Sequence, residues 1–238
     1  MVVRVQLSSG KLGNTAWTYN LAALDSGKGR EAGASTRDRS PTDSDPSIKM
    51  SISLANSALL VIDMQEHFSS IAGHLVPRLL PLIQLYHQKG LPVYFTQQGH
   101  LPDDNCTLVR RWGPPGQGSI LRYSDEWNLM PGLNDEAVAP HSCRITGKST
   151  YNAFLQTPLE ESLRRHGVNT VVVSGTLTNL CCETTAREAF CRNFDVVVLD
   201  DGCAAANSKH HRMALENLEF GFAEIWSIQD AMDELNKL

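Results

Sequence analysis

Short apolar runs alternate with amphipathic helical segments from residue 57 to the end of the chain, and this pattern limits the fold more than any other feature. The clearest runs are SALLVID at 57–63, LPVYFT at 91–96, NTVVVS at 169–174 and FDVVVL at 194–199. Runs that are apolar throughout, rather than at alternate positions, are typical of parallel strands buried on both faces. The sequence therefore predicts an α/β fold, a three-layer sandwich with helices on both faces of a doubly wound sheet.

The remaining elements follow the same alternation. Two shorter strands are expected near 144–146 and over 223–227, and residues 99–142 are expected to be irregular because they are rich in Gly, Pro and Trp. Helices are expected over residues 68–89, 155–166, 182–193, 208–219 and 228–238.

Composition excludes several classes of protein. The chain has 238 residues, of which 42% are hydrophobic, and a net charge of −5 with no long Lys/Arg run, which argues against nucleic-acid binding. No apolar stretch approaches the roughly 20 residues that span a bilayer, so no membrane association is expected. The six cysteines form no Cys-x-x-Cys pair and no secretory apolar block precedes them, which predicts free thiols in a reducing, cytoplasmic environment.

The first 50 residues differ from the rest of the chain. They carry seven basic and five acidic residues, and residues 25–49 hold only three apolar residues among Ser, Thr, Asp, Gly and Pro. Such a segment cannot bury enough surface to offset its ordering entropy, so a disordered extension over 1–50 and a single domain over 51–238 are predicted. Organelle targeting, a dispensable tail and a gene model extended upstream of Met50 are the three interpretations of the extension.

Three residues with reactive side chains follow predicted strands, at the edge where ligands of such sheets bind. Asp63 ends the first run, and either caps a helix or serves as a site carboxylate. Lys148 follows the short strand near 144–146, where a lysine is commonly a solvated loop residue. Cys181 follows a strand and a tight turn at the start of a helix, whose N-terminus lowers a thiol pKa, although a buried structural cysteine is the alternative. Cys182 is expected to pack toward the sheet.

If the three residues converge, they form a nucleophile site without histidine. The carboxylate of Asp63 takes the proton of the Cys181 thiol, and the ammonium of Lys148 supports both anions.

Three segments of the chain resemble the signature segments of the isochorismatase-like cysteine hydrolase family. They are ALLVIDMQEHF, ITGKSTYNAF and VSGTLTNLCCETTAREAF, in that order, within a resemblance that covers roughly 57–227. The resemblance implies a mostly parallel six-stranded αβα sandwich and a catalytic trio of Asp63, Lys148 and Cys181. It also implies a cis peptide bond at Thr176–Leu177, which turns the N–H of Leu177, with that of Cys181, into an oxyanion hole.

The family contains two chemistries. The presence of Cys181 favours the amidase branch, in which a thioester forms and ammonia leaves, and TNLCCETTAREAF is most similar to plant-type nicotinamidases and their bacterial relatives. The substrate is then a small-molecule amide such as nicotinamide. A vinyl ether hydrolase of the isochorismatase type and a catalytically silent binding protein remain as alternatives.

No catalytic metal or other cofactor is expected. Metal-binding nicotinamidases carry Asp-x-His after the second strand and a further His downstream, whereas this chain has Gln98 and His100 and no histidine near Cys106. One imidazole is a weak zinc anchor. His100 is expected to be a partly exposed loop residue, and Gln98 or His100 is the candidate for a hydrogen bond to the substrate.

The substrate pocket is expected to be lined by aromatic side chains and one arginine. Phe68, Trp112, Tyr151 and Phe154 are the aromatic candidates, Arg122 is available for a carboxylate, and Thr176 adjoins the turn. Trp112 and Trp127 have the alternative role of anchoring a long loop. The resemblance also implies a homo-oligomer.

Overall fold

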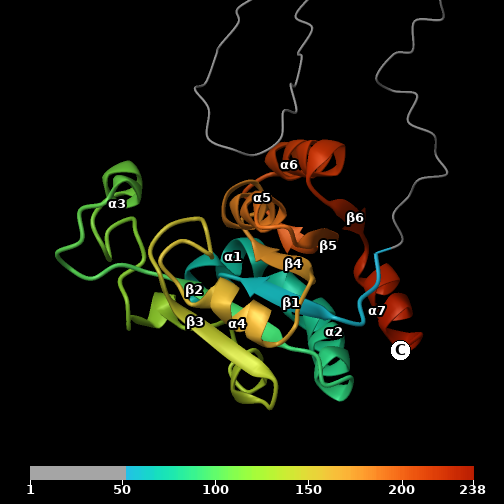
Figure 1. The fold of residues 1–238 in the computed structure, drawn as a ribbon. Coiled ribbons are helices and arrows are strands. Elements are labelled where there is room, and N and C mark those ends of the chain that lie inside the picture. The colour runs from blue at the N-terminus through green and yellow to red at the C-terminus, as the bar shows by residue number, and fades with distance from the viewer. Residues whose placement is uncertain (1–51) are drawn as a thin grey trace, which may run out of the picture. The chain divides into compact units, whose positions relative to one another are not determined.

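The computed structural model describes residues 52–238, so the extension predicted over 1–50 lies outside the described residues (Figure 1). Six strands form one sheet in the order β3-β2-β1-β4-β5-β6, and every neighbouring pair is parallel. This confirms the predicted α/β sheet. The strands are β1 (Ser57–Ile62), β2 (Val93–Gln98), β3 (Ser142–Lys148), β4 (Thr170–Thr176), β5 (Asp195–Ala204) and β6 (Glu224–Trp226).

Helices cover both faces of the sheet, and each face has its own hydrophobic core. On one face α2 (Val76–Gln88) and α7 (Ile228–Asn236) pack against Leu59 and Val61 of β1. On the other face α4 (Leu159–Arg165), α5 (Glu183–Cys191) and α6 (Ser208–Gly221) pack against Leu60 and Ile62. Alternate residues of β1 thus enter opposite cores, which explains why the strand is apolar throughout. None of the helices between residues 52 and 238 combines the length and apolar character needed to cross a membrane.

Two predicted helices are shorter than expected because of local breakers. The helix predicted over 68–89 is divided into a 3₁₀ turn at Glu66–Phe68, α1 (Ser69–Ala72), a second 3₁₀ turn at Gly73–Leu75, and α2, which carries a proline in its first turn. Proline is favoured in a first helical turn, where its missing N–H costs no hydrogen bond, although α2 itself also continues through Pro81. In the same way α4 begins only after Pro158, although the pattern predicted a start at residue 155.

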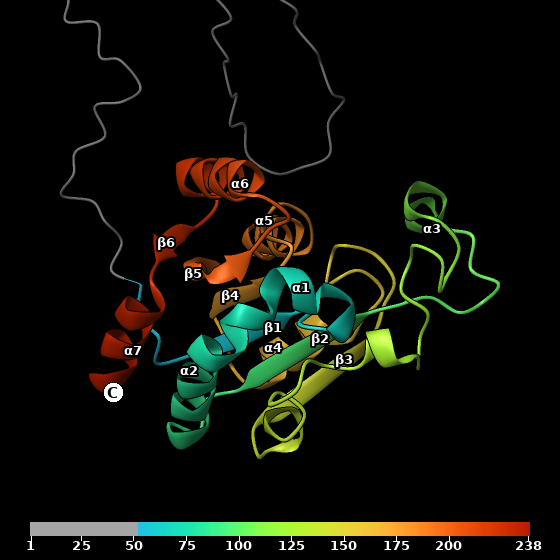
Figure 2. The same cartoon turned by 180° about the vertical axis from the view of Figure 1, so that it is seen from behind.

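A long excursion leaves the sheet between β2 and β3. It contains α3 (Thr107–Trp112), and both views show this helix far from the sheet (Figure 1, Figure 2). We call residues 101–121 the cavity loop. His100 closes its neck, because its N–H donates to the carbonyl of Ile120 at 2.9 Å and its carbonyl accepts from the N–H of Arg122 at 2.9 Å.

Candidate active site

Three side chains from the carboxyl ends of three strands meet in the interior. Asp63 follows β1, Lys148 is the last residue of β3, and Cys181 follows β4. The Nζ of Lys148 donates to Oδ2 of Asp63 and lies 3.5 Å from the Sγ of Cys181. Asp63 and Lys148 are 0% exposed and Cys181 is 3% exposed. The three residues predicted from the strand ends are therefore in direct contact, and we call them the trio.

The backbone at Asp63 aims its carboxylate across the strand ends. Its φ is 47°, in the left-handed region that few residues other than glycine adopt. Thr96, in the second half of β2, accepts a hydrogen bond from the N–H of Asp63 at 3.0 Å and donates from Oγ1 to Oδ1 of Asp63 at 2.6 Å. With Lys148 on the other oxygen, both carboxylate oxygens have a donor. The Asp63 carboxylate is therefore held in place through both oxygens and does not cap a helix.

The turn after β4 brings Cys181 close to β1. Gly175 has a φ of 112°, and a Cβ at this position would lie 2.1 Å from the carbonyl oxygen of Ile62, so only glycine fits there. The Thr176–Leu177 peptide bond is cis. A π-helical turn, Thr178–Cys182, follows and runs directly into α5. Cys182 is fully buried, and its Sγ lies 3.9 Å from the carbonyl of Ser174, as expected for a packing residue.

A histidine from another helix supports this turn. Nδ1 of His211, on α6, lies 2.9 Å from Oγ1 of Thr178. Burial lowers the pKa of His211, although the charge of Asp200 opposes this effect in part. The neutral form of His211 is therefore the one that holds the turn.

The charges in the trio are set by burial and by close pairing. Burial alone would lower the pKa of Lys148, but the charge of Asp63 and the hydrogen bonds to Asp63 and Cys181 act in the opposite direction. The net shift raises this pKa, so the lysine is an ammonium. Burial has the largest effect on the Cys181 thiol and raises its pKa far above the ordinary value, although the Lys148 charge acts in the opposite direction. The net shift is therefore upward, opposite to the lowering expected from the helix N-terminus, and burial is its largest cause.

A cavity of about 630 Å³ opens beside the turn that carries Cys181. Trp112 and Tyr151 line it, and they are bonded to each other, since Nε1 of Trp112 donates to the Tyr151 hydroxyl at 2.6 Å. Leu177 lines it as well. The full lining consists of Thr107, Leu108, Arg111, Trp112, Thr150, Tyr151, Leu177, Asn179, Leu180, Ala206, Asn207 and His210. Two of the predicted aromatic residues therefore reach the cavity.

Two other predicted aromatic lining residues lie elsewhere. Phe154 is 5% exposed and packs in the core against Phe194, with ring centroids 6.0 Å apart. Phe68 packs against the core on the opposite face of the sheet, which contains α2 and α7. Placing these two residues on the cavity was wrong, because their apolar rings are used to fill the two cores.

Arg122 and Thr176, which were predicted to bind the substrate, also have other partners in the fold. Arg122 donates from Nε to the carbonyl of Gly99 at 3.0 Å and from a terminal nitrogen to the carbonyl of Gly147 at 3.1 Å, so it braces the loop neck against β3. Thr176 is fully buried, and its hydroxyl donates to Ala204 on β5. Neither side chain lines the cavity.

His100 is fully buried, which corrects the prediction of a partly exposed loop residue. Its Nε2 lies 3.4 Å from Nε2 of Gln98, and its Nδ1 lies 3.5 Å from Oδ2 of Asp104 and 3.8 Å from Sγ of Cys106. Gln98 and His100 are absent from the cavity lining. Within residues 52–238, no group of three His, Cys, Asp or Glu side chains is arranged to hold a metal ion.

Trp127 has the anchoring role and Trp112 the lining role. Trp127 is buried, and its carbonyl accepts hydrogen bonds from the side-chain amides of Gln65 and Gln97 at 2.8 and 2.9 Å. Its ring occupies the space that a Cβ at Gly99 would need, at 2.6 Å. Trp127 therefore anchors the loop, and Trp112 lines the cavity.

Thr96, Asn179, Arg111 and His210 are site residues that the sequence analysis did not single out. Thr96 ends the predicted strand LPVYFT, so the rule that identified Asp63 would have found it as well. Arg111 of the cavity loop and His210 of α6 come near Asn179, in the turn after β4, only when the chain folds.

A protein-family model, that of the isochorismatase domain, matches residues 57–230 of this chain. The chain belongs to the isochorismatase family. The chain is 37% identical over 192 residues to Nicotinamidase 3 of Arabidopsis thaliana, covering 81% of this chain and 92% of that protein. It is also 29% identical over 197 residues to the ureidoacrylate amidohydrolase RutB of Methylobacterium radiotolerans, covering 71% of this chain and 75% of that protein.

The fold of the isochorismatase-family chain is shared by solved structures. A cysteine hydrolase from Pseudomonas syringae superposes with a TM-score of 0.72 at 23% identity, covering 78% of this chain and 95% of that one. This similarity shows the isochorismatase-like hydrolase fold that the three segments implied.

Proposed function

We propose that this isochorismatase-family protein hydrolyses a small-molecule amide through a cysteine nucleophile and releases ammonia and a carboxylic acid. One observation carries the proposal: the Lys148 ammonium contacts both the Asp63 carboxylate and the Cys181 sulfur inside a site closed to bulk water. A nucleophile, a base and a cation in contact are the parts that such a reaction needs.

In the first half of the reaction the thiol becomes the nucleophile. Asp63 takes the thiol proton of Cys181, and Sγ attacks the amide carbon to form a tetrahedral intermediate. The N–H groups of Leu177 and Cys181 hold its oxyanion. Asp63, now protonated, gives its proton to the departing nitrogen, the C–N bond breaks, and ammonia leaves a thioester on Cys181. Each oxyanion donor of this kind contributes on the order of 10²–10³-fold to the rate.

In the second half water replaces ammonia. Asp63 removes a proton from water, the hydroxide attacks the thioester carbon, and the carboxylic acid leaves as Sγ takes back a proton. Lys148 keeps the Asp63 carboxylate oriented through both halves and stabilises the thiolate when it forms. General acid–base transfer by a positioned carboxylate contributes about 10²–10⁴-fold.

Burial gives the thiol a protected resting state. Because desolvation raises the pKa of Cys181, the proton stays on sulfur until a substrate occupies the site. The thiolate then forms beside the Lys148 ammonium and is consumed in the attack. The similarity to a nicotinamidase and to a ureidoacrylate amidohydrolase supports an amide as the substrate, and nicotinamide is the first amide to test.

The test is ammonia release from a panel of small amides that includes nicotinamide. We expect turnover with the unaltered protein and a loss of at least about 10⁴-fold with Cys181→Ala, because the nucleophile is missing. Cys191→Ala is the matched control, since Cys191 is an exposed thiol on α5. Ammonia release that survives Cys181→Ala would overturn the mechanism. Pyruvate release from isochorismate without ammonia would identify the ether-hydrolase alternative.

A further inference from the structure

We propose that the amide substrate carries a carboxylate at the end remote from the scissile bond, and that Arg111 binds this carboxylate. The inference rests on the proposed amide hydrolysis and concerns the other end of the same substrate. It starts from the cavity of about 630 Å³ that adjoins Cys181 through its two lining neighbours, Leu177 and Leu180. A cavity of this size suits a small organic molecule.

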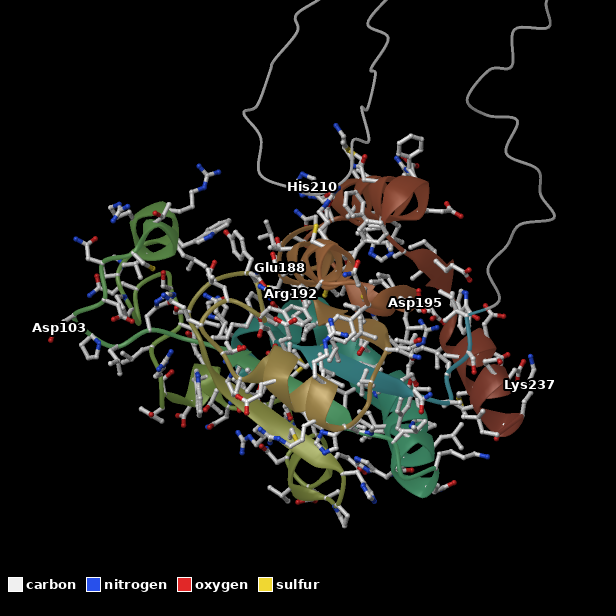
Figure 3. The ribbon with its side chains drawn as sticks, in the orientation of Figure 1. Asp103, Glu188, Arg192, Asp195, His210 and Lys237 are labelled. Atoms are coloured by element: carbon white, nitrogen blue, oxygen red, sulfur yellow. The ribbon has the colours of Figure 1, made fainter. Side chains whose placement is uncertain are left out.

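The cavity lining contains basic side chains and no carboxylate. Among the twelve lining residues Arg111 and His210 are the ionisable bases, and none is an aspartate or glutamate. His210 lies at the start of α6, at the end that faces the cavity loop (Figure 3). Asp103 lies far out on the loop, away from His210. A neutral substrate would leave the guanidinium without a counter-charge, but a carboxylate matches it in charge and geometry.

Arg111 has no hydrogen-bond or ion-pair partner within residues 52–238, and this distinguishes it from its neighbours. Arg110 donates to the carbonyl of Asn105 at 2.7 Å and to the Thr107 hydroxyl at 3.1 Å. Arg122, predicted to bind a carboxylate, donates to two backbone carbonyls instead. The guanidinium of Arg111 lies 5.9 Å from the centre of the Trp112 ring, and the residue is exposed and lines the cavity. Its donors are therefore free to bind a ligand in the cavity.

The cavity wall formed by the turn of Cys181 carries a hydrogen-bond acceptor instead of a cation. Asn179 lines the cavity two residues before the nucleophile, and its Oδ1 is buried without a hydrogen-bond partner in the described part of the chain. A buried acceptor is costly unless a donor reaches it. The NH₂ of a primary amide is such a donor. Asn179 thus brings an unpartnered acceptor to the wall formed by the turn of Cys181, and Arg111 brings a cation to the wall formed by the cavity loop. Together they complement an amide that bears a remote carboxylate.

Two matched pairs of substrates test the proposal through turnover. In each pair the amide is the same and the remote carboxylate is present or absent: 3-carbamoylbenzoate against benzamide, and succinamate against its methyl ester. We expect the charged member to have the higher kcat/KM by about 10- to 100-fold, the usual worth of a hydrogen-bonded ion pair. In Arg111→Gln this ratio should fall toward one. Arg110→Gln, which removes the same charge one residue away, should keep it.

A binding measurement separates failure of this inference from failure of the proposed reaction. Calorimetry with Cys181→Ala and 3-carbamoylbenzoate needs no turnover. We expect its Kd to rise at least about 10-fold when Arg111→Gln is added and at high salt, with benzamide unaffected by salt. Charged and neutral members that are hydrolysed or bound equally well, or a ratio that survives Arg111→Gln, would overturn the role of Arg111 and leave the cysteine reaction standing. Carboxylate binding without ammonia release from any amide would overturn the cysteine reaction and leave the role of Arg111 standing.

Discussion

The trio and the cavity loop lie next to each other in the fold but are built in different ways. Every polar atom of the Asp63 carboxylate has a donor, and the trio is sealed between two strands and a tight turn. The cavity loop, in contrast, is mostly exposed, with Leu108, Val109, Ser119 and Ile120 as its buried residues. Trp112, its main contact with the rest of the site, is 49% exposed.

This difference separates the reaction from the choice of substrate. The sheet determines where the nucleophile, the base and the cation lie, because their strands are paired along their length. The loop determines what reaches them, and it can change without altering the sheet, since loops tolerate substitution better than paired strands. Variants of the trio should therefore affect stability and chemistry together, whereas variants of the loop should affect substrate binding alone.

The largest effect is expected from Lys148→Met, which leaves the Asp63 carboxylate buried without its cation. Removing one partner of a buried ion pair costs about 3–5 kcal/mol of unfolding free energy. We also expect ammonia release to fall by at least about 10³-fold, because the thiolate loses its counter-ion. Urea denaturation and the ammonia assay measure the two effects.

Lys89→Met is the control for this variant, since Lys89 is an exposed lysine at the end of α2. It should leave both quantities within experimental error. If Lys148→Met unfolded at the same urea concentration as the unaltered protein, the trio would not be part of the folded core, and the contrast with the cavity loop would disappear.

An intermediate effect is expected when the pH is lowered, because each region contains a histidine whose pKa is lowered by burial. His100 lies at the loop neck and His211 supports the turn before Cys181. In the unfolded chain both take up a proton near their ordinary pKa of about 6.5, whereas the folded protein keeps them neutral. Stability should thus be constant above that pH and decrease below it, by about 1.4 kcal/mol per pH unit for each such histidine.

Urea midpoints measured from pH 8 to pH 5 test this expectation. His100→Gln and His211→Gln should each flatten the decrease, and His74→Gln, which replaces an exposed histidine, should not. A decrease that only His211→Gln flattens would limit the effect to the turn that carries Cys181. If neither variant changes the decrease in stability, other titratable groups cause it.

The smallest effect on stability is expected from Trp112→Phe, which removes the hydrogen bond to Tyr151 but keeps an aromatic ring on the cavity. The unfolding free energy should stay within about 0.5 kcal/mol, as for most surface changes. KM should rise several-fold, because one neutral hydrogen bond is worth about 1 kcal/mol. Trp226→Phe removes a comparable indole hydrogen bond, to Glu224, far from the cavity and should leave KM unchanged. A stability loss similar to that of Lys148→Met would show that the loop is part of the core.

Rules that use only the local sequence were sufficient to predict the sheet but not to predict which residues line the cavity. The apolar runs and the strand-end rule identified Asp63, Lys148 and Cys181, because a parallel sheet brings its carboxyl ends to one edge. The same rules did not separate Phe154, which fills a core, from Tyr151, which lines the cavity three residues earlier. Neighbours of similar chemistry can point in opposite directions, and nothing in their spacing reveals which.

The cavity loop shows this limit most clearly. The loop contains Arg110 and Arg111, and Arg122 follows it directly; any of the three is a suitable carboxylate ligand by residue type. Only the folded loop shows that two of them are used on neighbouring backbone and side-chain oxygens while Arg111 faces the cavity. Which donors remain open depends on contacts that form after the chain has folded.

By itself, the sequence determined the class of fold, the positions along the chain of the strands that carry the site, and the three reactive residues, since apolar periodicity and strand-end position are local properties. The tertiary structure decided the burial that raises the pKa of Cys181, the placement of Thr96 on the Asp63 carboxylate, and the residues that line the cavity. These properties depend on desolvation and on packing between distant segments, and both arise only when the whole chain is assembled.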